Sequence, residues 1–281
     1  MQLYNDVSYK VSEIITRNYS TSFSRAVSLL DPERRQAIHS IYGFVRLADE
    51  IVDTFHDFDK PRLFREFEQD YYTALERGIS MNPVLNSFQE TVRKYRIGDD
   101  LVQAFLRSMK KDLVKNGLYE KTEFDEYVYG SAEVVGLMCL RIFAGNDDAL
   151  FEELKLPARR LGAAFQKVNF LRDLGCDTVK LGRIYFPGMK TGMPDEELKQ
   201  GIISDITDDF KAALPGIRRL PEEARLPVLV AYYYYLELLE RIKKTPVSKL
   251  LSARIRVPDS RKLYLLISTW IKIKAGFLRM N

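Results

Sequence analysis

A tyrosine, an arginine and two aspartates share one face of a predicted helix near the start of the chain. Together with a histidine one turn earlier they are spaced three or four residues apart, and the stripe reads His39, Tyr42, Arg46, Asp49 and Asp53. Most other positions in this stretch are apolar, which is typical of a buried helix. Buried carboxylates one turn apart repel each other unless a cation offsets the repulsion. The stripe therefore predicts a buried site for a divalent metal ion.

A second stretch repeats this pattern far along the chain. Its polar residues step by three, four and four positions along one helical face, and they are Gln166, Asn169, Asp173 and Asp177. In a chain with 39 acidic residues, a single DxxxD pattern is usually an exposed helix surface. Two such patterns, each in an otherwise apolar helix and each beside an arginine, Arg46 or Arg172, favour one shared binding site.

These residue types indicate the chemistry of the site. Two facing aspartate pairs offer only oxygen ligands, which Mg²⁺ prefers together with substrate phosphates and waters. Arg46, Arg172 and Arg183 suit diphosphate oxygens, because a guanidinium group binds them in a fork. The sequence has no glycine-rich phosphate loop and no Ser-His or zinc pattern. We therefore predict a metal-bound diphosphate leaving group beside an aromatic cavity, whose rings would stabilise a carbocation.

The composition favours a folded globular protein. Hydrophobic residues make up 46% of the 281 positions, and the net charge of +4 is too small to call for nucleic acid as a partner. The two cysteines, Cys139 and Cys176, do not form a disulfide framework, which suits a reducing compartment. The charge-free apolar runs are shorter than the roughly 18 residues that span a bilayer. We expect a cytoplasmic protein, either soluble or peripheral at the inner face of the membrane.

Helical periodicity covers nearly the whole chain, and we find no convincing strand pattern. Asp31, Asp59 and Asn82 each precede a proline-containing first turn and are predicted helix caps. We predict a single all-α domain over residues 1–281. The expected helices cover 4–17, 31–56, 59–77, 82–95, 98–115, 123–144, 157–179, two helices that start near 204 and 222, and 258–277.

Three segments allow both a structural and a functional interpretation. Residues 18–25 are rich in serine and either cap a helix or bind a phosphate, and the local sequence favours the cap. Gly130 and Gly136 each cost a helix about 1 kcal/mol relative to alanine. They indicate either close helix packing or a wall for a bulky ligand, with equal weight. The basic C-terminal helix fits a membrane surface or ordinary solvent exposure.

Four segments closely resemble the phytoene synthase/squalene synthase family. They lie between about Ser20 and Lys262 and read TSFSRAVSLLDPERRQAIHSIYGFVRLADEIVD, YVYGSAEVVG, FQKVNFLRDLGCDTVKLGRIYFP and LPEEARLPVLVAYYYYLELLERI. The two aspartate motifs and GRIYFP are the most specific of these. The resemblance implies an all-α isoprenoid-synthase fold with a central cavity. It also implies head-to-head condensation of two prenyl diphosphates through a cyclopropyl diphosphate intermediate.

The resemblance further implies roles for individual residues. The catalytic metal ligands would be Asp49, Asp53, Asp173 and Asp177, and Tyr129 would be a further catalytic residue. The expected substrate-binding residues are Ser20, Ser22, Phe23, Tyr42, Arg46, Val134, Gln166, Asn169, Arg172, Tyr235, Arg256 and Lys262. The chain departs from the family pattern at Glu50, Val168 and Cys176, and none of these changes removes a predicted metal ligand.

Within the family, the LPEEAR segment, the short length and the missing C-terminal membrane anchor look most like bacterial phytoene synthases. This favours geranylgeranyl diphosphate as substrate and phytoene as product, in carotenoid biosynthesis, with Mg²⁺ (or Mn²⁺ in its place) and no nicotinamide cofactor. The alternative is C30 chemistry on farnesyl diphosphate, which gives dehydrosqualene or, with NADPH, squalene. A non-catalytic scaffold is a further alternative, and the retained aspartates argue against it. We expect a monomer.

The predicted product bears on where the protein works. A C30 or C40 hydrocarbon cannot leave readily into water, since each buried CH₂ is worth roughly 0.8 kcal/mol. We therefore expect the cavity to open near a membrane surface and the contact to be peripheral. The basic residues of the C-terminal helix, Lys272 and Lys274 among them, are the expected contact.

Overall fold

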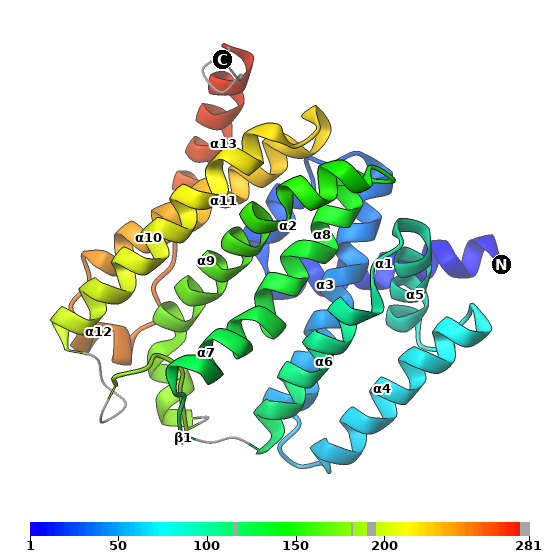
Figure 1. The fold of residues 1–281 in the computed structure, drawn as a ribbon, viewed down its shortest axis with the longest axis horizontal. Helices are drawn as coiled ribbons and strands as arrows, with labels where there is room; N and C mark the ends of the chain where they lie inside the picture. The colour runs from blue at the N-terminus through cyan, green and yellow to red at the C-terminus, as the bar shows by residue number, and fades with distance from the viewer. Residues whose placement is uncertain (115–116, 181, 190–194, 276–281) are drawn as a thin grey trace.

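The computed structural model describes residues 1–114, 117–180, 182–189 and 195–275. The described chain is a bundle of α-helices, so the predicted all-α class is confirmed (Figure 1). In chain order the helices are α1 Gln2–Tyr19, α2 Thr21–Val27, α3 Pro32–Asp53, α4 Lys60–Arg77, α5 Pro83–Tyr95, α6 Asp99–Val114, α7 Lys121–Val128, the π-helix η1 Tyr129–Glu133, α8 Val134–Ala144, α9 Asp148–Lys180, α10 Glu196–Arg219, α11 Glu222–Lys243, α12 Val247–Ser252 and α13 Asp259–Lys274.

The two helices that carry the aspartates lie inside the bundle. Helix α3 packs against α1, α5, α6 and α8, whereas α9 packs against α8, α10, α11 and α12. A continuous cluster of buried apolar side chains joins these helices, and it includes Phe44 of α3 and Leu171 of α9. Because both helices are covered on several sides, their polar stripes face other helices rather than open solvent.

Local capping chemistry sets three of the helix starts as predicted. The Oδ1 atoms of Asp31, Asp59 and Asn82 accept backbone N–H groups of the first turns of α3, α4 and α5, each at 3.0 Å. Each of these helices has a proline in its first turn, where the missing N–H costs nothing. The serine-rich patch also caps a helix, because the Oγ of Ser20 accepts the backbone N–H of Phe23 at the start of α2.

Two predicted helix starts are wrong. Helix α9 begins at Asp148 and runs through Pro157, and α10 begins at Glu196, with Asp195 as its cap. A proline inside a helix costs roughly 3 kcal/mol, and tertiary packing must offset it. Here α10 approaches the proline ring closely, since a Cβ on Gly216 would lie 2.2 Å from the Cβ of Pro157.

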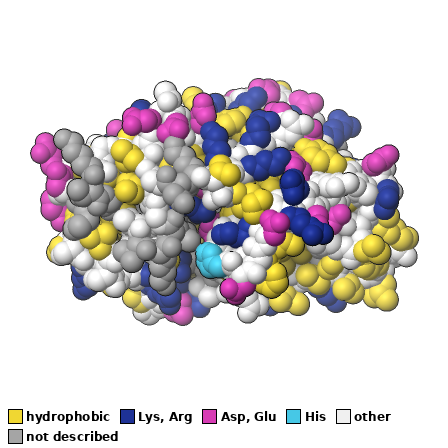
Figure 2. All heavy atoms as spheres, turned by 90° about the horizontal axis from the view of Figure 1, so that it is seen from below, with side chains coloured by type: hydrophobic (Ala, Val, Ile, Leu, Met, Phe, Trp, Pro, Cys, Tyr) yellow, Lys and Arg dark blue, Asp and Glu magenta, His cyan; other side chains and the backbone are white. Residues whose placement is uncertain are grey.

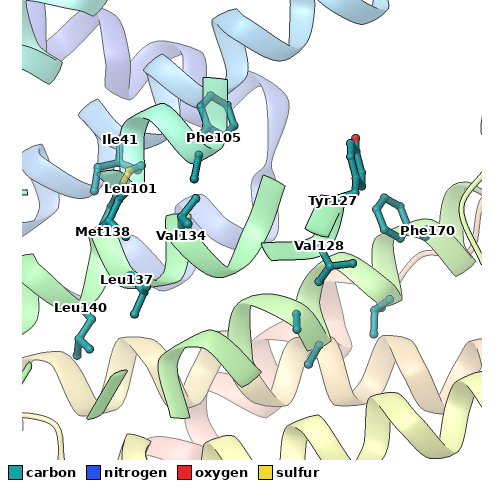
Figure 3. Close-up of a cluster of buried hydrophobic side chains, with 14 of the residues drawn as sticks. Ile41, Leu101, Phe105, Tyr127, Val128, Val134, Leu137, Met138, Leu140 and Phe170 are labelled. Carbon is teal, nitrogen blue, oxygen red and sulfur yellow. The ribbon is translucent and has the colours of Figure 1, made fainter. Parts of the chain in front are cut away.

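The segment predicted as one helix over 123–144 contains a π turn. The five residues of η1 lie between α7 and α8, and a π turn has one more residue than an α turn. The face that starts at Tyr127 therefore continues at Ser131 and Val135 rather than at Gly130 and Val134. Figure 3 shows the result, with Val134 turned toward Phe105 and Tyr127 beside Phe170.

Close helix packing explains the two glycines of this segment. A Cβ on Gly130 would lie 2.8 Å from the carbonyl oxygen of Ala104, and one on Gly136 would lie 2.8 Å from that of Ala158. Both contacts are with backbone atoms, which cannot move aside as a flexible side chain can. The packing interpretation is confirmed, and Gly136 also forms part of a cavity wall.

Among the described residues, one stretch, Lys121–Ala144, is long and apolar enough to cross a membrane by length and composition. The sequence did not predict it, because Glu133 and Arg141 interrupt its apolar run. In the structure 56% of its most apolar window is buried within the protein, against α6 and α9. This stretch is therefore part of the core.

A short pair of parallel strands was not predicted. Strand β1, Gly117–Leu118, pairs with β2, Arg183–Ile184, so that Gly117 lies opposite Arg183. Two residues are too few for an alternating pattern to be visible in the sequence. The pairing brings Arg183, which follows α9, close to the end of α6.

Candidate active site

A cavity of about 510 Å³ lies between α2, α3, α8, α9, α10 and α11. Its wall is largely apolar and aromatic, and its polar residues gather at one end. The polar and charged residues of the lining are Ser20, Tyr42, Arg46, Asp49, Asp53, Ser131, Gln166, Asn169, Arg172, Asp173, Asp177, Tyr235 and Arg254, with Tyr19, Tyr127 and Tyr185. Figure 2 looks onto the end of the bundle at which α9 ends, where Lys and Arg side chains gather beside Asp and Glu.

Both aspartate stripes reach this cavity, apart from one residue. His39 is buried elsewhere, on the side of α3 that faces α1, and the charged groups nearest to it include Glu13 and Arg17 of that helix. Burial lowers the pKa of His39 to about 4, and its Nδ1 has no hydrogen-bond partner in the described part of the chain. His39 is therefore a neutral core residue and not part of the polar site.

Arginines neutralise three of the four aspartates. Arg46 pairs with Asp49 and also with Glu50. The Nη1 of Arg183 donates a hydrogen bond to the Oδ1 of Asp53 at 2.6 Å. On α9, the Nε and Nη2 of Arg172 donate to Asp173 at 3.0 and 2.5 Å.

Arg254 adds a second cation at Asp173, and it was not predicted. Its Nε lies 2.8 Å from the Oδ1 of Asp173, and its side chain lines the cavity. The predicted residue, Arg256, is exposed and lies outside the cavity lining. The segment between α12 and α13 is not helical, so residues two positions apart can be placed differently. The sequence signal for this cation was the pair of arginines in RIR, residues 254–256.

Asp177 is the least compensated carboxylate of the four, since it forms no ion pair with any residue that the structure describes. Burial raises its pKa to about 7, and the charges of Asp173 and Asp53 contribute further. The pKa of Asp49 rises to about 6, first through burial and then through the charge of Asp53. Because Asp53 on α3 affects Asp177 on α9, the two stripes face each other. The site therefore has an unmet demand for positive charge.

The sequence did not reveal a fifth carboxylate behind this site. Asp112 of α6 is buried, and burial raises its pKa to about 7. The Oη of Tyr127 donates to its Oδ2 at 2.7 Å, and the Oη of Tyr119 donates to its Oδ1 at 3.4 Å. The Nη2 of Arg183 donates to its backbone carbonyl at 3.1 Å. Asp112 thus connects a cavity tyrosine with the arginine that holds Asp53; the signal for it was a carboxylate on the apolar face of α6.

Two residues predicted on the helix over 123–144 lie outside the cavity. Tyr129 packs under the guanidinium of Arg159, with 5.1 Å between the group and the ring centroid, and Val134 is fully buried in the core. The residues that line the cavity are Tyr127 and Val135 instead. The π turn accounts for the shift from Val134 to Val135, because it moves the cavity face by one residue. Tyr127 precedes the turn, so the turn does not account for the difference between Tyr129 and Tyr127.

Of the predicted serines and the late lysine, only Ser20 lines the cavity. Ser22 is half-buried on α2 outside the lining. Lys262 is buried, and its Nζ donates to the Oγ1 of Thr21 at 3.3 Å and lies 3.4 Å from Asp259. Lys262 therefore attaches α13 to the start of α2 rather than facing the cavity.

Pairs of aromatic rings form much of the remaining wall. Phe23 and Tyr42 stack with their centroids 5.2 Å apart, and both line the cavity as predicted. Phe165 and Tyr235 stack at 4.0 Å, and the Oη of Tyr235 donates to the Oδ1 of Asn169 at 3.4 Å. Ring faces carry negative partial charge, so this wall suits a positively charged guest.

The donor set fits a hard divalent cation that brings further ligands with it. Within the described ranges, no group of three or more His, Cys, Asp or Glu side chains is placed to hold a metal ion. The four aspartates nevertheless supply only oxygen atoms, and burial together with the charges of neighbouring aspartates raises the pKa values of Asp49 and Asp177. Mg²⁺ commonly takes one or two carboxylates and completes its shell with phosphate oxygens and water.

Comparison with known sequences indicates one family. A family model described as squalene/phytoene synthase matches residues 16–261. A chloroplastic phytoene synthase from an Oncidium hybrid cultivar is 30% identical over 278 residues, which cover 89% of this chain and 64% of that protein. The 15-cis-phytoene synthase of a Synechocystis species is 27% identical, over 94% of this chain and 85% of its own. The chain thus spans a little less than two thirds of the first relative's length.

Solved structures support the fold. The crystal structure of a dehydrosqualene synthase in complex with ligand superposes with a TM-score of 0.85, covering 98% of this chain and 99% of the other at 23% identity. A squalene synthase from Alicyclobacillus acidocaldarius superposes with a TM-score of 0.73 over 86% and 95% of the two chains, at 18% identity. This chain belongs to the squalene/phytoene synthase family.

Proposed function

We propose that this chain is a metal-dependent prenyltransferase that joins two geranylgeranyl diphosphates head to head, through a cyclopropyl diphosphate, to give phytoene. The observation that carries this proposal is the position of two facing aspartate pairs, with their arginines, at one end of a long aromatic cavity. The names of the curated relatives, which are phytoene synthases, support the choice of a C20 substrate.

The polar end would bind the diphosphates. Asp49, Asp53, Asp173 and Asp177 would hold Mg²⁺, which supplies positive charge to offset that of the departing diphosphate. Arg46 and Arg172 lie beside these carboxylates with N–H groups in the fork geometry that suits phosphate oxygens. Arg254 lies at the same end, so three guanidinium groups border the proposed diphosphate position.

The apolar part would hold the two prenyl chains. When diphosphate leaves, the positive charge remains on carbon, and the rings of Phe165, Tyr235 and Phe170, which line the cavity, would stabilise it. Forming phytoene from two substrates releases two diphosphates and two protons and consumes no reductant. An enclosed wall also keeps water from the carbocation, which it would otherwise convert to an alcohol.

Tyr127 takes the place that was predicted for Tyr129. Its ring lines the cavity and its hydroxyl is held by Asp112 at 2.7 Å, so its position is defined by a buried charged group. Because Asp112 also contacts Arg183, a change at this carboxylate would alter both the aromatic wall and the arginine on Asp53.

Product analysis tests the proposal. Purified protein is incubated with Mg²⁺ and either farnesyl or geranylgeranyl diphosphate, with and without NADPH, and the hydrocarbons are identified by mass spectrometry. A C40 product formed without NADPH is the expected result, and Asp53→Asn should abolish it while the helical circular dichroism is retained. If neither substrate gives a hydrocarbon product, the proposal is refuted.

A C30 product is the second candidate. The superposing structures include a dehydrosqualene synthase and a squalene synthase, although their identities below 25% support the fold alone. In the same experiment, dehydrosqualene from farnesyl diphosphate, or squalene formed only with NADPH, would move the assignment to C30 chemistry.

A further inference from the structure

The last helix of the bundle exposes large apolar side chains along one face. Five of them, between 47% and 57% exposed, recur at spacings of one, three and four residues, and they are Leu263, Tyr264, Ile267, Trp270 and Ile271. The opposite face of α13, which includes Leu265 and the buried Thr269, packs toward α11. Figure 1 shows α13 in red at the outer edge of the bundle, next to α11. The apolar face thus has no partner among the described residues.

The same region has a larger net positive charge than the chain as a whole. The last 33 residues, from Lys249, contain eight basic residues and one acid, a net charge of +7 in a chain whose total is +4. The single acid, Asp259, is paired with Arg25 at 2.9 Å and lies 3.4 Å from Lys262. The exposed residues Lys272 and Lys274 flank the apolar face. An apolar face bordered by cations matches the surface of an anionic lipid bilayer.

We infer that α13 binds an anionic membrane by laying its apolar face in the lipid interface. The helix has 16 residues and is therefore about 24 Å long, too short to cross the hydrocarbon core. Trp270 and Tyr264 are residue types that favour the membrane interface. Docking of a second copy through this face would bring two groups of like charges together, whereas anionic lipid would neutralise them.

The position of α13 connects this surface with the cavity. Leu265 of α13 packs against a small cluster that includes Ala26 of α2, with Ala231 of α11 at its edge. Both alanines also line the cavity. The cluster that α13 packs against therefore also contributes to the cavity wall on this side. If the proposed function is correct, the apolar product has a short path from the cavity, between α2 and α11, to the bound membrane.

The chain contains a single tryptophan, Trp270, so intrinsic fluorescence reports directly on this face. The full chain is mixed with vesicles of phosphatidylcholine alone, or of phosphatidylcholine with phosphatidylglycerol, without substrate. With the anionic vesicles at low salt we expect a blue shift of Trp270 emission, quenching by brominated lipid and co-sedimentation. Raising the ionic strength should reverse much of the binding.

Matched variants test whether vesicle binding depends on the apolar face of α13 or on exposed apolar residues in general. Replacing Ile267→Ser and Ile271→Ser together should weaken vesicle binding on the order of tenfold. The control replaces Leu3→Ser and Val7→Ser, which are also exposed apolar residues but lie on α1. The control should bind as the wild type does, and both variants should keep the helical circular dichroism. Lys272→Glu with Lys274→Glu should weaken binding to anionic vesicles.

Three results would overturn the inference. One is wild-type protein that stays in the supernatant with anionic vesicles at low salt. Another is equal binding by the α13 and α1 variants. The third is a blue shift that grows with protein concentration in the absence of vesicles, together with a dimer in sedimentation, which would identify the face as a contact between copies. Because substrate is absent, a failure of the proposed prenyltransferase activity would not alter these results.

Discussion

Removing one carboxylate from the aspartate site should stabilise the metal-free protein while it abolishes activity. Asp177 is the residue to replace, because it forms no ion pair with a described residue and because burial and two neighbouring aspartates raise its pKa to about 7. Asp177→Asn keeps the size of the side chain and removes its charge, while one acceptor oxygen becomes an N–H donor.

The size of the effect follows from the pKa shift. Each pKa unit corresponds to about 1.4 kcal/mol, so a rise from 3.8 to about 7 amounts to about 4 kcal/mol at pH 8. Asp177 is half-buried, and solvent screening lowers this figure to about 2 kcal/mol. For a chain of this length, that difference raises the melting temperature by roughly 4 °C.

The raised pKa of Asp177 also predicts the direction in which the stability of the protein changes with pH. A carboxyl whose pKa is raised in the folded protein binds its proton more tightly there than in the unfolded chain. The free energy of unfolding of the wild type should therefore fall as the pH rises from about 4 to about 7, contrary to ordinary acid denaturation. Asp49 and Asp112 contribute in the same direction, so Asp177→Asn should reduce this slope without removing it.

Thermal melts in the presence of EDTA at pH 5 and pH 8 provide the measurement. Asp70→Asn, at an exposed position of α4, is the matched control and should melt as the wild type does at both pH values. A lower melting temperature for Asp177→Asn than for the wild type at pH 8 would refute the reasoning. So would a wild type that is no more stable at pH 5 than at pH 8.

Three further predictions concern the cavity wall, the helix contacts and ligand binding. In a steady-state assay, Tyr127→Phe should lower the rate of product formation roughly tenfold or more, whereas Tyr129→Phe should leave it nearly unchanged. Of these two residues, only Tyr127 lines the cavity and donates a hydrogen bond to a buried carboxylate. Equal effects of the two variants would contradict this prediction. Gly175→Ala should destabilise the protein by roughly 2 kcal/mol in urea unfolding, because its Cβ would lie 2.0 Å from the carbonyl oxygen of Leu251. Gly201→Ala has open space around it and should stabilise the protein by about 0.5–1 kcal/mol in the same measurement. Mg²⁺ and inorganic diphosphate together should raise the melting temperature more than either alone. At a hundredfold excess over Kd, the free energy of unfolding should rise by about 2.7 kcal/mol. No shift of the melting temperature at millimolar concentrations would favour a scaffold protein.

Features that depend on neighbours in sequence could be predicted well. The starts of α3, α4 and α5 follow from one capping side chain and one proline each, and these are local interactions. The stripes on α3 and α9 follow from helical spacing, which needs only the period of 3.6 residues. His39 shows the limit of that argument, since it lies at the edge of its stripe and the packing of α1 decides which way it faces.

Features that depend on distant parts of the chain could not be predicted. Pro157 looks like a helix start, and only its contact with Gly216 of α10 accounts for its place inside α9. The π turn of η1 has no spacing signal of its own, and it moved the cavity face from Val134 to Val135. The sequence alone does not distinguish Arg254 from Arg256, because only the position of α9 in the fold determines which of them reaches Asp173.

The hydrogen bond from Arg183 to Asp53 joins residues 130 positions apart in the chain. Helix pairs such as α9 and α10, by contrast, form between neighbours in sequence. Closing a long loop costs more entropy than closing a short one, so contacts between distant residues tend to form late in folding. Refolding protein should therefore regain its helical circular dichroism before it regains the ability to bind diphosphate. A preparation judged by helix content alone can contain molecules in which the site has not yet assembled.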